Sequence, residues 1–255
     1  MICRSRLLHC TAMGLSLLAA TAAHAGLIET FEAPGVTQSS VSNTQVVDFN
    51  DMTLGYRSSA TVQLSSLTVT YSGDFFIMTA DQYGGAADLS DPTKGTNYLG
   101  VGSGQSVTMT LSTPQAYFGI WFSAADQFNN IDFYRGNTLL SSVAGTGPVL
   151  SSLSSSYNGN PTAAFHGQDS GEKFVFIDFS AQSAADMFDK IVLSNGNGGT
   201  IFESDNHTFS AAIQNPSPGM SNVPEPNTLS LIGLGGLSLA VHASVRRRRT
   251  GPKSL

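Results

Sequence analysis

The sequence predicts an all-β protein, an antiparallel β-sandwich that occupies residues 26–213 of the 255. Two observations predict this fold class. Short runs of alternating apolar and polar residues recur along this region, and Gly, Asn, Asp and Ser separate them, as turns between strands require. In addition, no stretch of the region carries an apolar stripe at helical spacing over three turns. Strands without intervening helices are typical of a sandwich rather than of βαβ units.

The predicted strands place apolar residues at every second position, so that one face of each strand is buried. In residues 106–111, for example, Val107, Met109 and Leu111 share one face. The predicted strands are residues 45–49, 61–71, 75–78, 106–111, 116–122, 130–133, 139–143, 174–179, 188–193 and 208–213.

Turn-forming residues predict how these strands are connected. Residues 135–138 and 195–199 are rich in Gly and Asn and predict hairpin turns. The alternation within residues 61–71 changes phase at residues 65–66, which predicts a bulge or bend inside that strand. Residues 144–162 are rich in Gly, Ser, Pro and Asn and predict a long loop.

Residues 1–25 predict a secretory signal peptide, whose apolar part forms a signal helix. Two arginines begin the segment, and an apolar stretch follows over residues 7–23. Small residues then stand at Ala23 and Ala25, the positions that a signal peptidase reads. Cleavage is therefore expected before Gly26. An uncleaved membrane anchor is the alternative, but the apolar stretch is short and the cleavage site follows at once.

The composition of the mature chain excludes two classes of protein. Both cysteines, Cys3 and Cys10, lie in the signal peptide, so the mature chain is not a disulfide scaffold. Residues 26–222 hold five basic residues and 17 acidic ones, a net charge of −12. A nucleic-acid binder would carry a basic face instead, so no nucleic-acid partner is expected.

The C-terminal part of the chain predicts a linker, a transmembrane helix and a cytoplasmic tail. Prolines and serines in residues 214–222 favour an irregular linker. Residues 228–245 are apolar, and as a helix they span about 27 Å, close to the thickness of a bilayer core. The arginines that follow remain in the cytoplasm, as do residues 250–255. These arginines are Arg246, Arg247, Arg248 and Arg249.

Residues 223–249 resemble the PEP-CTERM sorting signal of exosortase-processed proteins in Gram-negative bacteria. The resemblance rests on three elements in order: a Pro-Glu-Pro motif, one apolar helix and a terminal arginine cluster. The same tail is also known as the ice-binding protein C-terminal domain, a label that says nothing about ice binding here. The residues of the motif are Val223, Pro224, Glu225 and Pro226.

This resemblance implies a route for the protein. A signal peptidase cleaves the chain on export through the inner membrane, where the C-terminal helix anchors it transiently. An exosortase-type membrane peptidase then recognises residues 223–226 and removes the helix, which releases the protein to the cell surface or the extracellular matrix. A permanently anchored single-pass envelope protein is the alternative.

The β region itself resembles a group of exosortase-dependent surface proteins. Residues 98–107, 117–124, 131–134 and 202–208 carry this resemblance. It implies a jelly-roll-like β-sandwich, and it brings no established activity with it.

Motifs that would indicate an enzyme are missing from the sequence. Residues 26–222 have no cysteine and only two histidines, His166 and His207. Residues 100–104 lack the Gly-x-Ser-x-Gly spacing of a nucleophile elbow. No phosphate-binding loop, dinucleotide fingerprint or zinc-protease motif is present. We therefore predict a protein that is not an enzyme. The alternative is a secreted glycan-active hydrolase, which would need a cleft with two paired carboxylates.

Acidic residues near both ends of the β region suggest a structural calcium ion. Glu29 and Glu32 lie near its start, and Glu203 and Asp205 lie near its end. The first and last strands of such sandwiches are often neighbours, so Glu32 and Asp205 are the candidates to share an ion, since calcium prefers several oxygen ligands. The acidic loop 81–91 is a second candidate, without the spacing of an EF-hand. A solvated acidic surface is the alternative for both.

A partner in the form of an extracellular polysaccharide would require exposed aromatic rings. Within residues 117–122, Tyr117 and Trp121 share one face of the predicted strand and Phe118 and Phe122 share the other. Tyr117 and Trp121 are the candidate platform, although one face must be core and tryptophan is often buried. The sequence thus predicts an exported β-sandwich that serves as a structural or glycan-binding module.

Overall fold

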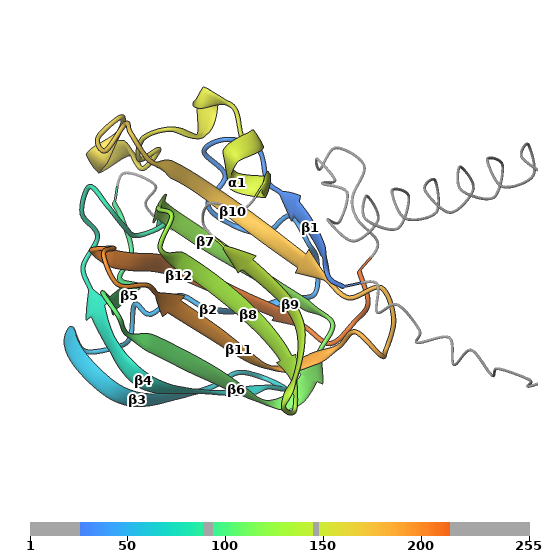
Figure 1. The fold of residues 1–255 in the computed structure, drawn as a ribbon. Helices are drawn as coiled ribbons and strands as arrows, with labels where there is room; N and C mark the ends of the chain where they lie inside the picture. Colours follow the sequence, from blue (N-terminus) through green and yellow to red (C-terminus); the bar gives the residue numbers. More distant parts are fainter. Residues whose placement is uncertain (1–25, 89–93, 145–147, 215–255) are drawn as a thin grey trace, which may run out of the picture.

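The computed structural model describes residues 26–88, 94–144 and 148–214. These residues form twelve strands, one short α-helix and two 3₁₀ turns (Figure 1). The strands are β1 (Ile28–Phe31), β2 (Gln45–Val47), β3 (Gly55–Gln63), β4 (Thr68–Met78), β5 (Tyr98–Gly102), β6 (Ser106–Gln115), β7 (Tyr117–Ala125), β8 (Asn129–Arg135), β9 (Thr138–Ala144), β10 (Lys173–Ser180), β11 (Phe188–Asn195) and β12 (Ile201–Ser210). The helix is α1 (Pro148–Ser152), and the 3₁₀ turns are Ser155–Tyr157 and Ala163–Phe165.

The predicted all-β, antiparallel class is confirmed, because the pairings between the described strands are all antiparallel. The predicted strands between residues 106 and 193 overlap β6 to β11. The turn at 135–138 joins β8 to β9 as a hairpin, as predicted. Strands β1 and β5 were not predicted from the sequence.

Two predicted connections differ in the structure. The phase change at residues 65–66 is a hairpin turn between β3 and β4, closed by a hydrogen bond of 2.8 Å from Leu64 N to Leu67 O, and not a bulge. The alternation changes phase there because the chain reverses. The turn at 195–199 is not a hairpin, since β11 pairs with β6 and β8 whereas β12 pairs with β2, β5 and β7.

All described strands belong to one sheet, in the order β1-β10-β7-β12-β5-β4-β6-β11-β8-β9, with β2 beside β12 and β3 beside β4. The sheet curls so that its two halves face each other (Figure 1). Rings from opposite halves are in contact, because the Phe133 ring of β8 lies 5.9 Å from Phe118 of β7 and 4.8 Å from Phe179 of β10 between centroids. The two predicted layers are therefore parts of one continuous sheet.

Strand β4 carries the sheet from one half to the other. Its first part pairs with β6 up to Gly73, and its last part pairs with β5. Gly73 has a φ of +127°, and a Cβ atom there would lie 2.2 Å from the Ser106 carbonyl oxygen. Because glycine has no side chain, it allows the two backbones to approach this closely.

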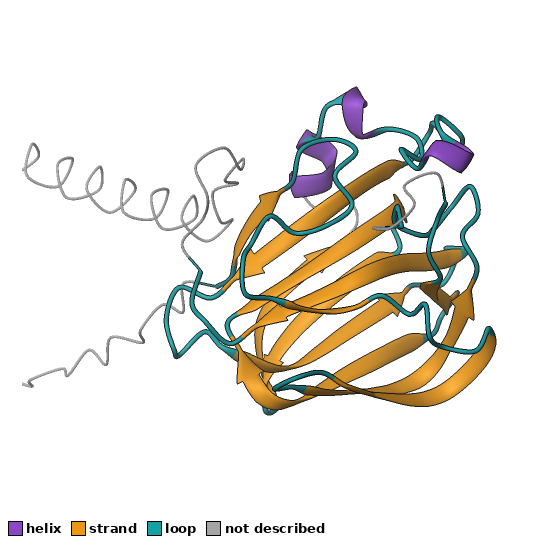
Figure 2. Ribbon diagram, turned by 180° about the vertical axis from the view of Figure 1, so that it is seen from behind, coloured by secondary structure: helices purple, strands orange, loops and turns teal. Residues whose placement is uncertain are grey.

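The main core lies between the two halves, yet both faces of β7 are buried. Phe118 and Phe122 point into the main core, and Trp121 points to the opposite, outer face. There it joins a small second cluster under the loop between β4 and β5, which contributes Ala86. Loops thus cover the outer face of β7, β10 and β12, and Figure 2 shows the helical segments gathered at one end of the sheet. The second cluster consists of Ala86, Trp121, Ala124, Phe174 and Phe176.

Among the described residues, none of the helices is long and apolar enough to cross a membrane. The predicted signal peptide at 1–25, the sorting signal at 223–249 with its helix at 228–245, the tail at 250–255, and all but the first residue of the linker at 214–222 lie outside the described residues.

Candidate ligand-binding pocket

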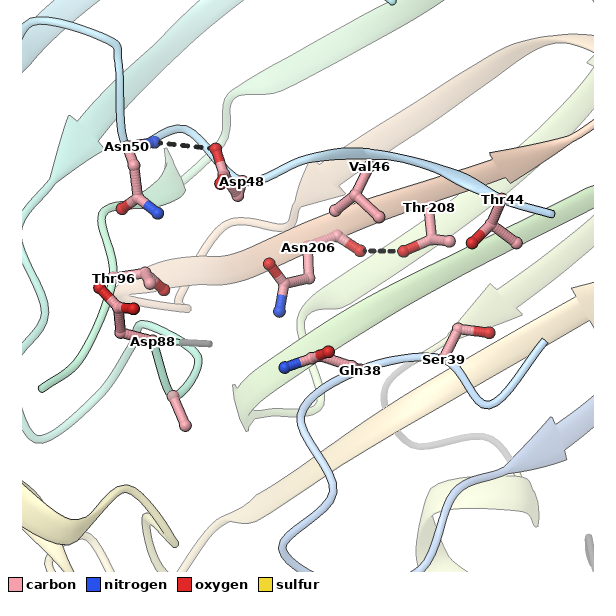
Figure 3. A pocket seen from close by; sticks show the side chains of 11 residues that line it. Gln38, Ser39, Thr44, Val46, Asp48, Asn50, Asp88, Thr96, Asn206 and Thr208 are labelled. Carbon is pink, nitrogen blue, oxygen red and sulfur yellow. Dashed lines mark hydrogen bonds between the residues drawn. The ribbon is translucent and has the colours of Figure 1, made fainter. Parts of the chain in front are cut away.

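A polar pocket of about 420 Å³ lies over the outer face of β12 (Figure 3). Its first wall is the segment 38–50, its second wall is formed by Ala87, Asp88 and Thr96, and its floor by Asn206 and Thr208. Nine of its eleven lining residues have polar side chains, and Val46 and Ala87 are the exceptions. The lining residues are Gln38, Ser39, Thr44, Val46, Asp48, Asn50, Ala87, Asp88, Thr96, Asn206 and Thr208.

The first wall is anchored to β7 and β10 by a buried network. Ser39 Oγ lies 2.6 Å from the Tyr117 hydroxyl oxygen and 3.5 Å from Asp178 Oδ1, and the Tyr117 hydroxyl donates to the same Asp178 oxygen. Burial raises the pKa of Asp178 to about 7, and the hydrogen bonds from Tyr117 and Ser39 oppose this shift. Nearby, Ser40 N donates to Glu32 Oε1 at 2.6 Å.

The second wall is anchored to β12 by Asp205. Its Oδ2 atom accepts hydrogen bonds from Ala86 N at 2.9 Å and from Thr96 Oγ1 at 2.5 Å. Its Oδ1 atom accepts one from Asn206 N at 2.7 Å. Burial raises the pKa of Asp205 to about 7, while the same three hydrogen bonds lower it. One fully buried carboxylate therefore fixes the wall and the floor together.

The floor lies at a β-bulge, where the pairing of β12 with β7 shifts register between Asp205 and Thr208. Asn206 has a φ of +48°, which is uncommon for a residue with a side chain. Thr208 Oγ1 donates to Asn206 O at 2.8 Å, and Asn206 Nδ2 donates to Thr37 O at 2.9 Å. Asn206 and Thr208 both line the pocket (Figure 3). Strained backbone of this kind is concentrated at functional sites.

The rim of the first wall is held by a second set of contacts. Asn50 N donates to Asp48 Oδ1 at 3.3 Å, as Figure 3 shows. Asn50 Oδ1 in turn accepts a hydrogen bond from Asn97 N at 2.9 Å, next to the second wall. Thr37, which directly precedes the first wall, connects it to the second wall. Its Oγ1 atom accepts a hydrogen bond of 3.4 Å from the backbone amide of Ala87. The polar lining is therefore held in place by neighbours that lie outside it.

The structure does not bring the predicted calcium ligands together. Strand β1 pairs with β10, and both β10 and β7 lie between it and β12, so the assumption that first and last strands are neighbours is wrong. Glu32 accepts a hydrogen bond from Ser40, and Asp205 accepts three from its own surroundings. Within the described ranges, no group of three or more His, Cys, Asp or Glu side chains is arranged to hold a metal ion.

The acidic loop 81–91 is only partly described. Asp81 Oδ1 accepts hydrogen bonds from the Tyr83 and Gly84 amides, and its Oδ2 atom accepts one from the Tyr98 hydroxyl at 3.1 Å. Asp88 lines the pocket instead, and Asp91 lies outside the described residues.

The predicted aromatic platform is wrong for both of its residues. Tyr117 and Trp121 are 0% exposed, because loops cover the face of β7 that carries them. Trp121 packs against Phe174 at 6.4 Å between ring centroids. Exposed aromatic side chains occur elsewhere, at Tyr56, Phe76 and Tyr83.

His207 lies in the main core and not in the pocket. Its Nδ1 atom is 3.1 Å from the Tyr71 hydroxyl oxygen, and its Nε2 atom is 3.0 Å from Ser204 Oγ. Burial lowers the pKa of His207 to about 3, so the ring is neutral at pH 7. The other histidine of residues 26–222, His166, is exposed.

Apart from Asp88, which belongs to the acidic loop 81–91, sequence reasoning missed the residues that line this pocket. They come from three separate segments, which only the fold brings together. One local signal was available: residues 201–210 form a strand with polar residues at adjacent positions from Glu203 to Thr208, which breaks the alternation of a half-buried strand. Such a break is typical of a bulge or of a strand covered on both faces.

Comparison with known families identifies the C-terminal segment. Residues 222–249 match the PEP-CTERM protein-sorting motif, which confirms the sorting signal predicted for 223–249. A PEP-CTERM motif implies export, membrane-associated sorting to the cell surface and processing by an exosortase. Comparisons of the chain with curated proteins and with solved structures gave no match.

Proposed function

We propose that this chain is a non-enzymatic surface or extracellular matrix protein whose β domain binds a glycan in the polar pocket. The sorting motif supports the location, and the lining of the pocket supports the ligand. In this proposal the domain is a jelly-roll-like sandwich, carried to the membrane by the signal peptide at 1–25. An exosortase-type peptidase then acts at residues 223–226 and removes the single transmembrane helix at 228–245.

The chemistry of the lining suits a sugar. Each sugar hydroxyl both donates and accepts hydrogen bonds, and the pocket offers both kinds of partner. Ser39 and Thr44 have hydroxyl groups, Gln38 and Asn50 have amides, and carboxylates accept only. A volume of about 420 Å³ lies within the range of small-molecule sites.

The pocket is also largely preformed. Asp205 fixes the second wall and Asp178 the first, through contacts that need no ligand. A preorganised site spends less binding energy on ordering its side chains, which favours affinity for a small polar ligand. This is the feature that distinguishes the pocket from a solvated acidic surface.

A glycan-active hydrolase is the second candidate, and one observation favours it. Asp48 and Asp88 line the same pocket, so two carboxylates are available on opposite walls. A glycosidase uses such a pair, one as general acid and the other as nucleophile or base. The two functions differ in product, because only the hydrolase releases new reducing ends from a bound glycan.

A glycan array tests the proposal directly. The full-length chain in mild detergent is applied to the array beside Thr44→Val, which removes one hydroxyl of the first wall at nearly constant volume. We expect a defined set of glycans to bind the wild type and the variant to lose that set, with no reducing ends released from any bound glycan. If no glycan is retained, the binding proposal fails. If reducing ends are released and Asp48→Asn stops their release, the hydrolase replaces it.

A further inference from the structure

We infer that the pocket is one end of a longer surface for a chain of neutral or amino sugars, with Tyr56 and Phe76 as a second, stacking subsite. This inference rests on the proposed function and adds to it the ligand's charge class and length.

Exposed apolar side chains gather in the segments that build or border the pocket. Eight large apolar side chains of the described residues are more than a third exposed, and six of them belong to residues 36–56 and 76–83. A contiguous exposed apolar patch indicates an interaction site, and among these residues the rings of Tyr56 and Phe76 are in direct contact. These six are Val36, Val46, Leu54, Tyr56, Phe76 and Tyr83.

Tyr56 and Phe76 form an ordered aromatic pair on the sheet surface. They lie opposite each other in the register of β3 and β4, and they are 59% and 39% exposed. Their ring centroids are 5.7 Å apart, with an interplanar angle of 67°. The Tyr56 hydroxyl donates a hydrogen bond to the Asp74 carboxylate, which holds the tyrosine ring in one orientation.

The aromatic pair is connected to the pocket through a short, tethered segment. Asn50 lines the pocket, and Tyr56 follows it by six residues. Six residues span at most about 21 Å even when fully extended. The segment begins at a fixed point, because Asn97 donates hydrogen bonds to both the side chain and the backbone carbonyl of Asn50. A chain of a few sugar rings covers this distance.

The chemistry of the pair suits a pyranose ring. One face of such a ring presents C–H groups, which pack against the electron-rich face of an aromatic side chain. Its edge presents hydroxyl groups, for which Asp74 is an acceptor beside Tyr56. A purely apolar partner would gain nothing from that carboxylate.

Charge selects the class of glycan. The described residues include 16 Asp and Glu against five Lys and Arg. Three of these carboxylates, Asp48, Asp74 and Asp88, lie in the pocket or beside the aromatic pair. A negative field repels polymers of uronic acids and attracts amino groups. Neutral and amino sugars are therefore the expected ligands, and acidic polysaccharides are rejected.

Affinity as a function of chain length tests this inference on the full-length protein. The probes are cello- and chitosan-oligosaccharides of one to six sugars, and polygalacturonate fragments of the same lengths. We expect at least tenfold tighter binding of the longest neutral or amino chain than of the single sugar, and no binding of polygalacturonate.

The double variant Tyr56→Ala, Phe76→Ala should lose this gain in affinity with chain length, and Tyr56→Phe should keep it because the ring remains. Leu139→Ala, another exposed apolar residue far along the chain, is the matched control and should bind like the wild type.

The possible failures are distinguishable. If Thr44→Val abolishes binding at every length while the aromatic double variant binds like the wild type, the inference is wrong and the proposed function stands. Preference for polygalacturonate contradicts the assignment of charge class. If no oligosaccharide binds at any length although the glycan array is positive, the ligand class is wrong, whereas a negative array removes the proposed function as well. A change in oligomeric state on gel filtration in the double variant would assign the pair to self-association instead.

Discussion

The Asp205 carboxylate accepts a hydrogen bond of 2.5 Å from the Thr96 hydroxyl, and this contact joins β12 to the second wall of the pocket. The amides of Ala86 and Asn206 donate to the same carboxylate. Asp205→Ala leaves these buried donors without their acceptor, so we expect the free energy of unfolding to fall by at least about 2 kcal/mol. Unfolding in urea measures the change.

Asp51→Ala is the control for this variant, since Asp51 is exposed and the substitution should change the free energy of unfolding by less than about 0.5 kcal/mol. Hydrogen exchange tests the contact at a single site, since the Ala86 amide should exchange faster in Asp205→Ala than in the wild type. Equal stability of the two variants would show that Asp205 does not anchor the wall.

Stability should fall as the pH rises, because of buried carboxyl groups on the outer face. Burial raises the pKa of Glu203 to about 9, and the carboxylates of Glu172 and Asp126 raise it further, while a backbone hydrogen bond opposes the shift. In the unfolded chain a Glu has a pKa of about 4.3. The folded state therefore holds a proton that the unfolded state has lost, so this contribution is complete below about pH 4 and disappears as the pH rises through 9.

Asp178 and Asp205, each with a pKa raised to about 7, act in the same direction. We expect the free energy of unfolding to decrease between about pH 5 and pH 9, by up to about 1.4 kcal/mol per pH unit for each group that titrates. Glu203→Gln keeps the shape of the side chain and cannot ionise, so its stability should depend less on pH above 7. A variant with the same slope as the wild type would mean that Glu203 is ionised in the folded protein.

The bend of the sheet depends on Gly73. A Cβ atom there would lie 2.2 Å from the Ser106 carbonyl oxygen, whereas a Cβ on Gly136, which also has a positive φ, would meet nothing within 4 Å. We expect Gly136→Ala to cost about 1 kcal/mol for backbone strain alone, and Gly73→Ala to cost at least about 2 kcal/mol more because β4 and β6 must move apart. Thermal unfolding of the two variants measures the loss of stability in each. Similar costs at the two sites would contradict the close approach at the bend.

The sorting signal makes a prediction about the mature C-terminus. If an exosortase removes the helix, protein recovered from the cell surface or the medium should end near Val223 to Pro226 and lack the arginines at 246–249. Mass spectrometry of the intact protein measures this end. Replacing Glu225 by Gln within the motif should leave the longer form in the membrane fraction. Secreted protein that still carries the four arginines would refute the removal of the helix by an exosortase, and protein with the arginines found in the membrane fraction alone would support the permanently anchored alternative.

The parts that could be predicted from the sequence are those that local residue order determines. The sorting motif is one contiguous segment, and strand alternation identified most strands of the second half of the domain. The burial of Trp121 could not be predicted from the sequence. Alternation separates the two faces of a strand without showing which one is exposed, and in β7 both faces are buried. A tight turn and a bulge change the phase of the alternation in the same way, so the pattern at residues 65–66 does not distinguish the hairpin turn from the predicted bulge.

The pocket was beyond prediction for a different reason. Ser39, Asp88 and Thr208 are far apart in the chain, and they meet only because β12 lies between β7 and β5 in the sheet. The expectation for Glu32 and Asp205 failed on the same point, since strand order is a long-range property. The sequence shows that polar residues occur in the pocket segments and at Glu32 and Asp205, but it does not show which residues lie beside them in the fold.

The measurement that tests the central claim most directly is the affinity of pocket variants for the strongest ligand of the glycan array. Isothermal titration of the full-length chain compares Thr44→Val and Asp48→Asn with Thr138→Val, the same substitution as the first at an exposed position of the β8–β9 hairpin. Each pocket variant removes hydrogen-bonding capacity that the sugar would use, so we expect about a tenfold loss of affinity, equal to about 1.4 kcal/mol, and no loss for Thr138→Val. Unchanged affinity in both pocket variants would contradict the assignment of this pocket as the glycan site.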